Sequence, residues 1–199
     1  MLKTPNFDKK ILGTTLPQNG WTIRDQSTTA TSSVGFYPVG RERKCGRVTT
    51  SPAFWASAVM PGTFGDIDYR IRIAGSNTNF TYVTVRNQNI AGFFDNCYSL
   101  RLRSDQAQVD FVKQCGGNVY IRATYAKTFS MSDVRVRIVM QGLVMHAWVN
   151  DDYIGNFDFT GDVLCSSVAF NTGGYGLVAL NKTYYFMPDY PQPIIGVIK

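Results

Sequence analysis

The sequence predicts an all-β protein, built as a sandwich of two antiparallel sheets. Eight short runs alternate apolar and polar residues, which is the pattern of strands with one buried face. Of the fourteen acidic residues only Glu42 is a Glu, whereas a helical protein would use Glu freely on its surface. No stretch of ten residues shows a helical period. Many short strands separated by turns indicate a sandwich or a barrel, and the 199 residues fit one domain, 1–199.

The alternating runs follow one another through the chain and are separated by clusters of Gly, Asn, Asp and Ser. In order, strands are expected at 67–73, 81–86, 98–103, 108–113, 119–124, 134–140, 143–149 and 153–159. The segment 24–33 is rich in Ser and Thr and is expected to form an exposed loop. The segment 184–193 is expected to form an aromatic, Pro-rich tail. The sequence contains neither an internal repeat nor a linker that would mark a second domain.

Two consecutive hairpins late in the chain can be aligned from their apolar residues. A two-residue turn at Gln141-Gly142 places Ile138 opposite Met145, and the other apolar pairs then share one face. A slip of one residue would mix the two faces, which supports this alignment. A second turn at Asn150-Asp151-Asp152 places Met145 opposite Phe157 on the same face.

The same alignment predicts which side chains share the outer face of this three-stranded unit. The rows across it are expected to be Arg137, His146 and Asn156, then Arg135, Trp148 and Ile154. Opposed side chains on neighbouring strands lie about 5 Å apart. A cation, an imidazole, an amide and an indole are therefore expected side by side outside the core.

The four cysteines leave the disulfide pattern open. Cys97 and Cys115 flank a hairpin that turns near Asp105-Gln106, but its apolar alignment puts the two thiols on opposite faces. A Cys97–Cys115 bridge, with Cys45–Cys165 as its companion, is one of three connectivities. Four buried free thiols are the alternative.

Several segments carry a family resemblance. They are Phe7-Asp8, Gly20-Trp21, the strand 66–72, the hairpin segments 134–138 and 147–151, and the closing strand 174–180. Together they resemble the concanavalin A-like lectin and glucanase superfamily, in particular its laminin-G-like domains, over about residues 7–187. The resemblance implies a jelly roll in which a concave sheet or the rim loops bind carbohydrate. The strand pattern is also similar to that of bacterial keto-disaccharide hydrolase domains.

Arginines at alternate positions recur on three predicted strands and account for much of the net charge of +6. Each strand carries two arginines on one face and an aliphatic residue on the other, at Arg70/Arg72, Arg101/Arg103 and Arg135/Arg137. One interpretation is a solvated sheet face with Asp68, Asp110 and Asp133 as ion-pair partners. The other is a face that recognises sulfated or uronic glycans or phosphate, because guanidinium groups bind such anions bidentately.

A secreted, lectin-like carbohydrate-binding domain is the function that these features favour. An indole on a sheet face can stack on a sugar ring while polar neighbours bind hydroxyl or acidic groups. The ligand is expected to be a glycan, and the arginines favour an acidic or sulfated one. It is expected to bind the concave sheet at Trp148, Arg135, Arg137, His146 and Asn156. Arg86, Arg101 and Tyr82 would extend this site if their strands belong to the same sheet. The alternative for Trp148 is that an N-terminal loop covers it.

A glycoside hydrolase or lyase on the same fold is the alternative function, with His146 and Asp158 as catalytic candidates. Glycosidases typically use two carboxylates. The single Glu lies in a basic loop, so the sequence favours a noncatalytic protein over an enzyme, and catalysis stays the alternative. Asp151 and Asp152 are weak calcium candidates, because Asp is also common in turns. No other metal or cofactor is expected from a chain with one His.

The triplets at Asn79 and Asn181 match N-glycosylation acceptors, which fits a glycoprotein that is secreted or at the cell surface. No apolar run approaches the roughly 20 residues of a membrane-spanning helix. Nucleic acid is disfavoured as a partner, because the charge is modest and no stacking aromatic motif is present. A structural, adhesion or coat protein is the second alternative. The oligomeric state is not predicted.

Overall fold

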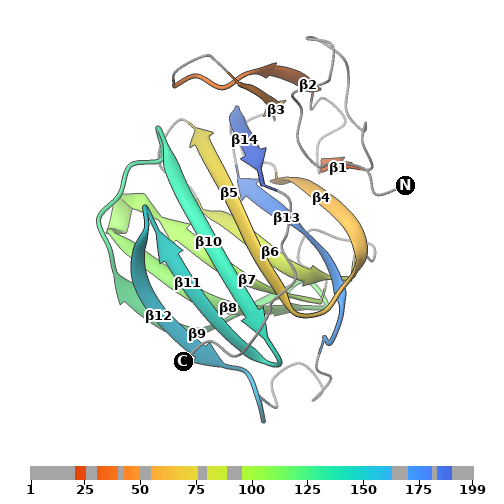
Figure 1. The fold of residues 1–199 in the computed structure, drawn as a ribbon, viewed down its shortest axis with the longest axis vertical. Coiled ribbons are helices and arrows are strands. Elements are labelled where there is room, and N and C mark those ends of the chain that lie inside the picture. Colours follow the sequence, from red (N-terminus) through yellow and green to blue (C-terminus); the bar gives the residue numbers. More distant parts are fainter. Residues whose placement is uncertain are drawn as a thin grey trace.

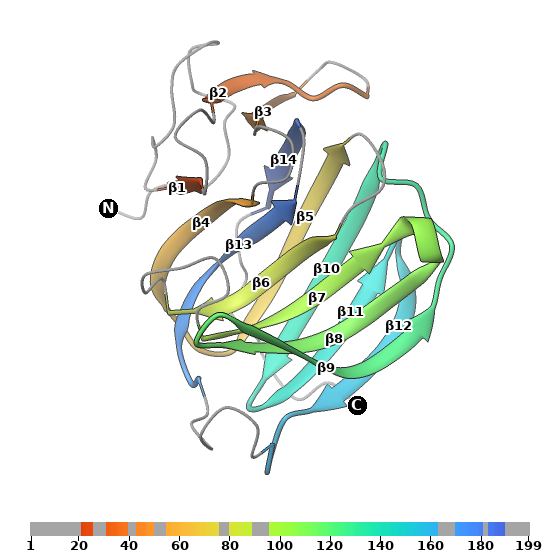
Figure 2. The ribbon, with the colours of Figure 1, turned by 180° about the vertical axis from the view of Figure 1, so that it is seen from behind.

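The computed structural model describes residues 21–25, 31–39, 43–49, 55–75, 80–88, 96–162, 170–180 and 183–189. Over these residues the chain forms two antiparallel seven-stranded sheets, sheet I and sheet II, which lie face to face (Figure 1). Figure 2 shows the same sandwich from behind, with strands of sheet II in front. The predicted fold class is confirmed. None of the described segments is a helix long and apolar enough to cross a membrane.

Sheet I has the order β12-β11-β10-β5-β14-β3-β2. Its strands are β2 (Thr31–Phe36), β3 (Lys44–Thr49), β5 (Ile67–Gly75), β10 (Val134–Gln141), β11 (Val144–Val149), β12 (Asp152–Asp158) and β14 (Tyr184–Pro188). Sheet II has the order β1-β4-β13-β6-β7-β8-β9. Its strands are β1 (Thr22–Asp25), β4 (Trp55–Phe64), β6 (Thr81–Asn87), β7 (Cys97–Arg103), β8 (Gln108–Cys115), β9 (Asn118–Ala126) and β13 (Gly173–Leu180).

All eight alternating runs are strands, β5 to β12, and the expected closing strand is β13. Two other expectations are wrong. The segment 24–33 contains the end of β1 and the start of β2, which are the edge strands of the two sheets. The segment 184–193 begins with β14, which lies between β3 and β5. Four of the five β14 residues are buried, so its apolar residues form a continuous run with no alternation to detect.

Aromatic rings join the two sheets in the core. Trp21 is fully buried and makes edge contacts with Tyr175 of β13 and Phe186 of β14, at centroid distances of 5.9 and 5.1 Å. Tyr69 of β5 lies 4.7 Å from Tyr175. Such pairs add about 0.5–1.5 kcal/mol each beyond the area that they bury.

The β10–β11 hairpin has a register two residues away from the predicted one. Ile138 lies opposite Ala147, because the turn is Gly142-Leu143, one residue later than expected. Gly142 has φ +54°, as the first position of a tight hairpin turn requires. A two-residue shift keeps each side chain on its predicted face. It changes the neighbours, however, so that Arg137 lies opposite Trp148.

The predicted register between β11 and β12 is confirmed only as far as Ala147. Met145 lies opposite Phe157, as expected. A β-bulge beyond Ala147 then places Trp148 opposite Tyr153 instead of the predicted Ile154. The extra residue of a bulge moves a side chain along the strand relative to its partner, so an aromatic ring takes the place of an aliphatic neighbour.

The predicted disulfide pattern is wrong. Cys45 and Cys97 are both buried and neither forms a disulfide, so neither a Cys97–Cys115 nor a Cys45–Cys165 bridge forms. Cys97 lies opposite Gln114, which puts the following Cys115 on the other face of the hairpin. The Cys97 thiol donates a hydrogen bond to Gln114 Oε1 at 2.8 Å. Cys115 is disulfide-bonded, and Cys165 lies outside the described residues.

Candidate functional site

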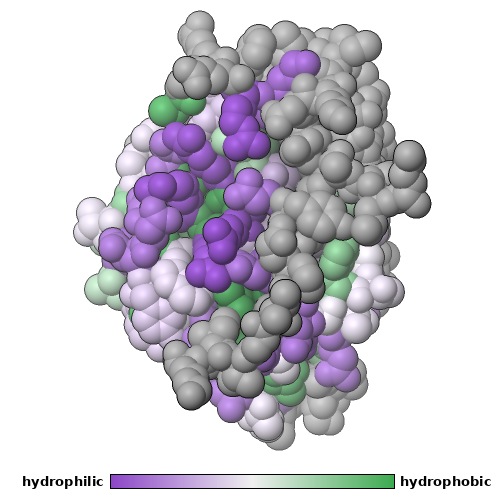
Figure 3. Space-filling view, in the orientation of Figure 1, coloured by the Kyte–Doolittle hydropathy of each residue, from purple (hydrophilic) through white to green (hydrophobic). Residues whose placement is uncertain are grey.

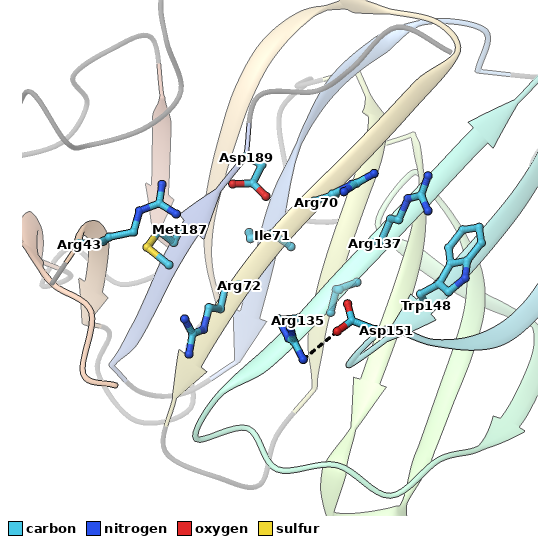
Figure 4. A pocket seen from close by; sticks show the side chains of 11 residues that line it. Arg43, Arg70, Ile71, Arg72, Arg135, Arg137, Trp148, Asp151, Met187 and Asp189 are labelled. Carbon is cyan, nitrogen blue, oxygen red and sulfur yellow. Dashed lines mark ion pairs between the residues drawn. The ribbon is translucent and has the colours of Figure 1, made fainter. Parts of the chain in front are cut away.

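The outer face of sheet I carries a groove with a volume of about 440 Å³ (Figure 4). We call it the basic groove, because five arginines and two aspartates dominate its lining. The lining residues are Arg43, Arg70, Ile71, Arg72, Arg135, Val136, Arg137, Trp148, Asp151, Met187 and Asp189. Figure 3 shows hydrophilic side chains gathered over the middle strands of this face.

Four of the arginines form two cross-strand pairs between β5 and β10. Arg72 lies opposite Arg135, and Arg70 lies opposite Arg137. Alternate residues of a strand point to opposite faces; Ile71, between the two β5 arginines, is buried in the core, so the arginines face outward. Like charges directly opposite each other destabilise a sheet. The arrangement therefore needs acidic partners, and it concentrates guanidinium groups in two adjacent rows.

Two aspartates compensate part of this charge. Asp68 accepts hydrogen bonds from Arg137 Nε and Nη2 at 2.9 and 2.8 Å, and from Arg70 Nη2 at 3.2 Å. Asp133 accepts from Arg72 Nε and Nη2 at 2.6 and 2.5 Å. These aspartates are two of the three partners that the sequence predicted for the strand arginines. Because they hold three guanidinium groups at two or more atoms each, they fix the direction of those side chains.

The same contacts lower the pKa values of both carboxyl groups. Hydrogen bonds from Arg72 lower the pKa of Asp133, against a smaller opposing effect of burial. For Asp68 burial acts to raise the pKa, but the hydrogen bonds and charges of Arg137 and Arg70 outweigh it, so the pKa is lowered. Both groups are therefore charged at neutral pH in the folded protein.

We expect the free energy of unfolding to fall as the pH is lowered below about 4, the pKa of an unfolded Asp. A carboxyl group whose pKa is lower in the folded state stabilises the fold above its unfolded pKa and loses that effect as the pH falls through its folded pKa. Urea unfolding over a pH series measures this slope. The Asp68→Asn, Asp133→Asn double variant should show a shallower slope, and an unchanged slope would contradict the assignment.

A cluster of rings on β11 and β12, which we call the aromatic platform, lies beside the groove. It consists of Trp148, Tyr153 and His146. The Trp148 and Tyr153 centroids lie 5.1 Å apart, and His146 stacks at 6.3 and 6.2 Å from these rings. The Tyr153 hydroxyl accepts a hydrogen bond from Asn156 Nδ2 at 3.0 Å and lies 3.1 Å from His146 Nδ1. Tyr153 is 51% exposed, so its ring is available to a ligand.

Arg137 joins the platform to the groove. Its guanidinium carbon lies 4.6 Å from the ring centre of Trp148, a cation–π contact. Burial lowers the pKa of His146, which favours the neutral imidazole. The predicted neighbour of His146 was Arg137, but Val139 takes that place. The alternative cover for Trp148 was an N-terminal loop, and residues 1–20 lie outside the described chain.

Five of the eight predicted ligand residues come together on this face: Trp148, Arg135 and Arg137 line the groove, and His146 and Asn156 belong to or adjoin the platform. The other three do not extend it, because β6 and β7 belong to sheet II. Tyr82 is 3% exposed. Arg101 is buried, and its Nε donates to Asp110 Oδ2 at 2.7 Å.

Arg86 has a structural setting that also removes it from the predicted surface. It is 2% exposed. Its guanidinium group donates to the carbonyl oxygens of Gly65 and Phe170 and to Asp66 Oδ1, each at 3.1 Å. Burial lowers its pKa. Arg86, near the end of the central strand β6, therefore ties together three chain segments and is not presented to a ligand.

The predicted ligand residues do not include four that the structure places at the site, Arg43, Arg70, Arg72 and Tyr153. Arg70 and Arg72 were named as alternating arginines of a possible anion-binding face, but their place beside Arg135 and Arg137 depends on the pairing of β5 with β10, which joins segments more than 60 residues apart in sequence. Tyr153 was missed because of the bulge. Arg43 precedes β3, whose position beside β14 had no local signal.

The two catalytic candidates have separate partners. His146 lies opposite Asn156 and contacts the Tyr153 hydroxyl. Asp158 Oδ1 accepts a hydrogen bond from the Thr160 N–H at 2.8 Å. Hydrogen bonds from the side chain of Thr160 and from its backbone lower the pKa of Asp158. Asp158 therefore stabilises the turn that follows β12, which is a common role of Asp.

The calcium candidates are paired with cations. Asp151 pairs with Arg135 and Asp152 with Lys127. Within the part of the chain that the structure describes, no three His, Cys, Asp or Glu residues are grouped so that they could hold a metal ion. The glycosylation candidates Asn79 and Asn181 lie outside the described residues.

No family model matches the sequence, and no curated protein matches it. Solved structures do match. The carbohydrate binding module CBM66 from Bacillus subtilis has a TM-score of 0.62 at 16% identity, with 86% of this chain and 96% of that chain covered. A GH16 protein of the Bacteroides ovatus mixed linkage glucan PUL, solved with a product, has a TM-score of 0.59 at 11% identity, with 96% and 97% covered.

The carbohydrate recognition domain of Emp47p is also similar, with a TM-score of 0.53 at 11% identity, covering 94% of this chain and 95% of that chain. Similarity at this level of identity establishes the fold and leaves function to the site itself. The two antiparallel sheets and the closing strand β13 indicate the same fold as these matches. The chain has the concanavalin A-like jelly-roll fold that its strand pattern resembles.

Proposed function

We propose that the protein is a noncatalytic carbohydrate-binding domain that holds an acidic glycan across the basic groove and the aromatic platform. The observation that carries the proposal is the cross-strand pairing of four arginines directly beside Trp148. Guanidinium forks bind carboxylate and sulfate groups bidentately. An exposed ring such as Tyr153 supplies an apolar surface with a polar edge for a sugar ring.

The fold supports the carbohydrate part of the proposal, since the similar structures include a carbohydrate binding module and a carbohydrate recognition domain. The acidic part rests on this chain's own residues. Five arginines line the groove, and an acidic ligand would relieve the repulsion between the paired rows. A glycan of this kind is met outside the cell, and we extend the proposal to a secreted or cell-surface protein.

Replacing Arg135 by Gln should weaken binding of an acidic oligosaccharide roughly tenfold or more, because a hydrogen bond to a charged group contributes about 1.5–3 kcal/mol. The Arg135 side chain is 59% exposed, so the fold should tolerate the change. Calorimetric titration with uronic and sulfated oligosaccharides, chosen from a panel that includes neutral ones, measures the effect.

The matched control is Arg47→Gln. Arg47 is an exposed β3 residue that stacks on Tyr185 and lies outside the groove lining, so its replacement removes the same charge elsewhere. We expect it to leave binding nearly unchanged. Equal weakening by both variants would show that only the overall charge matters, and the site assignment would then fail.

A further inference from the structure

The ion pairs of the basic groove are not equivalent. Asp68 is 12% exposed and Asp133 30% exposed, and each grips an arginine through two hydrogen bonds. Asp151 is 73% exposed and meets Arg135 through one contact, Nη2 to Oδ2 at 2.8 Å. Figure 4 shows this carboxylate beside Arg135, with the ion pair as a dashed line. Exposed single-contact pairs are weak and easily exchanged.

The position of this carboxylate is fixed by the backbone and not by the ion pair. Asp151 belongs to the tight turn between β11 and β12, where Asn150 and Asp151 have φ of +53° and +68°. The Asn150 N–H donates to the Arg135 carbonyl oxygen at 2.8 Å. The Arg135 N–H in turn donates to Asn150 Oδ1 at 2.9 Å. Asn150 therefore anchors the turn to the backbone of Arg135. Asp151, the next residue, contacts the side chain of the same arginine.

We propose that Asp151 is a specificity-determining residue, a tethered carboxylate that occupies the anion position of Arg135 until a ligand anion displaces it. This inference rests on the proposed function. A ligand with one carboxylate only exchanges one carboxylate for another at Arg135 and gains little. A sulfate group, or a chain whose second acid reaches Arg72 or Arg70, gains contacts that Asp151 does not make. The groove therefore selects polyvalent or sulfated glycans over singly charged ones.

The turn offers a matched pair of variants, Asp151→Asn and Asp152→Asn. The two variants remove one negative charge at neighbouring positions, the last residue of the turn and the first residue of β12, and Asn accepts the positive φ of Asp151. Asp152 is 68% exposed and pairs with Lys127, outside the groove. The probe is inorganic sulfate at constant ionic strength, followed by NMR through the arginine Nε–H and Trp148 indole N–H signals.

We expect Asp151→Asn to bind sulfate about two- to fivefold more tightly, the range that an exposed ion pair covers, with Asp152→Asn unchanged. Unchanged affinity in Asp151→Asn, or an equal gain in both variants, would overturn the inference. If wild-type protein still binds acidic oligosaccharides in that case, the proposed function stands without it. If no variant shows sulfate-dependent shifts at the groove arginines and no acidic oligosaccharide binds, both the inference and the acidic part of the proposed function fail.

Discussion

Replacing Trp148 by Ala is expected to weaken glycan binding roughly thirtyfold or more. The indole is half-buried, packs against Tyr153 and carries the guanidinium group of Arg137 on its ring. Its removal deletes a stacking surface and also frees the arginine that joins platform and groove. Loss of such an anchor typically costs 2 kcal/mol or more, roughly a thirtyfold loss in affinity. Calorimetric titration with the acidic oligosaccharide measures it.

The control is Trp55→Ala on β4 of sheet II. Trp55 is also half-buried and packs against an aromatic ring, Tyr82, at 5.8 Å. Its removal tests the general effect of deleting an indole from a sheet face. Binding that survives in Trp148→Ala but disappears in Trp55→Ala would move the ligand site to the outer face of sheet II.

The second large effect is expected on stability, from Asp110→Ala. The Asp110 carboxylate is fully buried on β8, where it accepts hydrogen bonds from Arg101 Nε at 2.7 Å and Thr124 Oγ1 at 2.6 Å. It also pairs with Arg103, with Nε 3.1 Å from Oδ2. Removing it leaves the 9% exposed Arg101 side chain without its carboxylate. Breaking a buried ion pair in this way costs about 3–5 kcal/mol.

The expected result is a fall in Tm of about 10 °C, because a protein of this size loses about 2–4 °C for each kcal/mol. Calorimetry and urea unfolding both report it. Asp110→Asn keeps the size of the side chain and should lose less. Asp152→Ala removes an exposed carboxylate and should change stability by less than about 1 kcal/mol. If Asp110→Ala also lowered the free energy of unfolding by less than about 1 kcal/mol, the structural role of the buried ion-pair network would be contradicted.

The sequence predicted the strands best where apolar and polar residues alternate along the chain. The eight runs of β5 to β12 alternate in this way, and this was sufficient to find them, even in β6, where every residue is buried. No alternating run identified β1, β2, β3 and β4, or β14, whose apolar residues form a continuous run. Those strands are specified by tertiary neighbours that no local pattern reveals.

The candidate site was predictable in its members and less so in its geometry. Faces were correct, because the side-chain period of two survives a two-residue register shift, so Trp148, Arg135 and Arg137 were placed together. The neighbours were wrong, because the turn begins one residue later and a bulge brings Tyr153 beside Trp148. The pairing of β5 with β10, which creates the arginine rows, depends on the whole fold.

We propose that the charges of the basic groove recognise an acidic glycan. The most direct measurement is calorimetric titration of one acidic oligosaccharide and its carboxyl-reduced, neutral counterpart, each at low and high salt. Salt screens exposed charges over a Debye length of about 10 Å at 0.1 M and 3 Å at 1 M. We expect the acidic compound to bind more tightly than the neutral one at low salt and to lose most of that advantage at high salt. Equal affinity for the two compounds at both salt concentrations would contradict it.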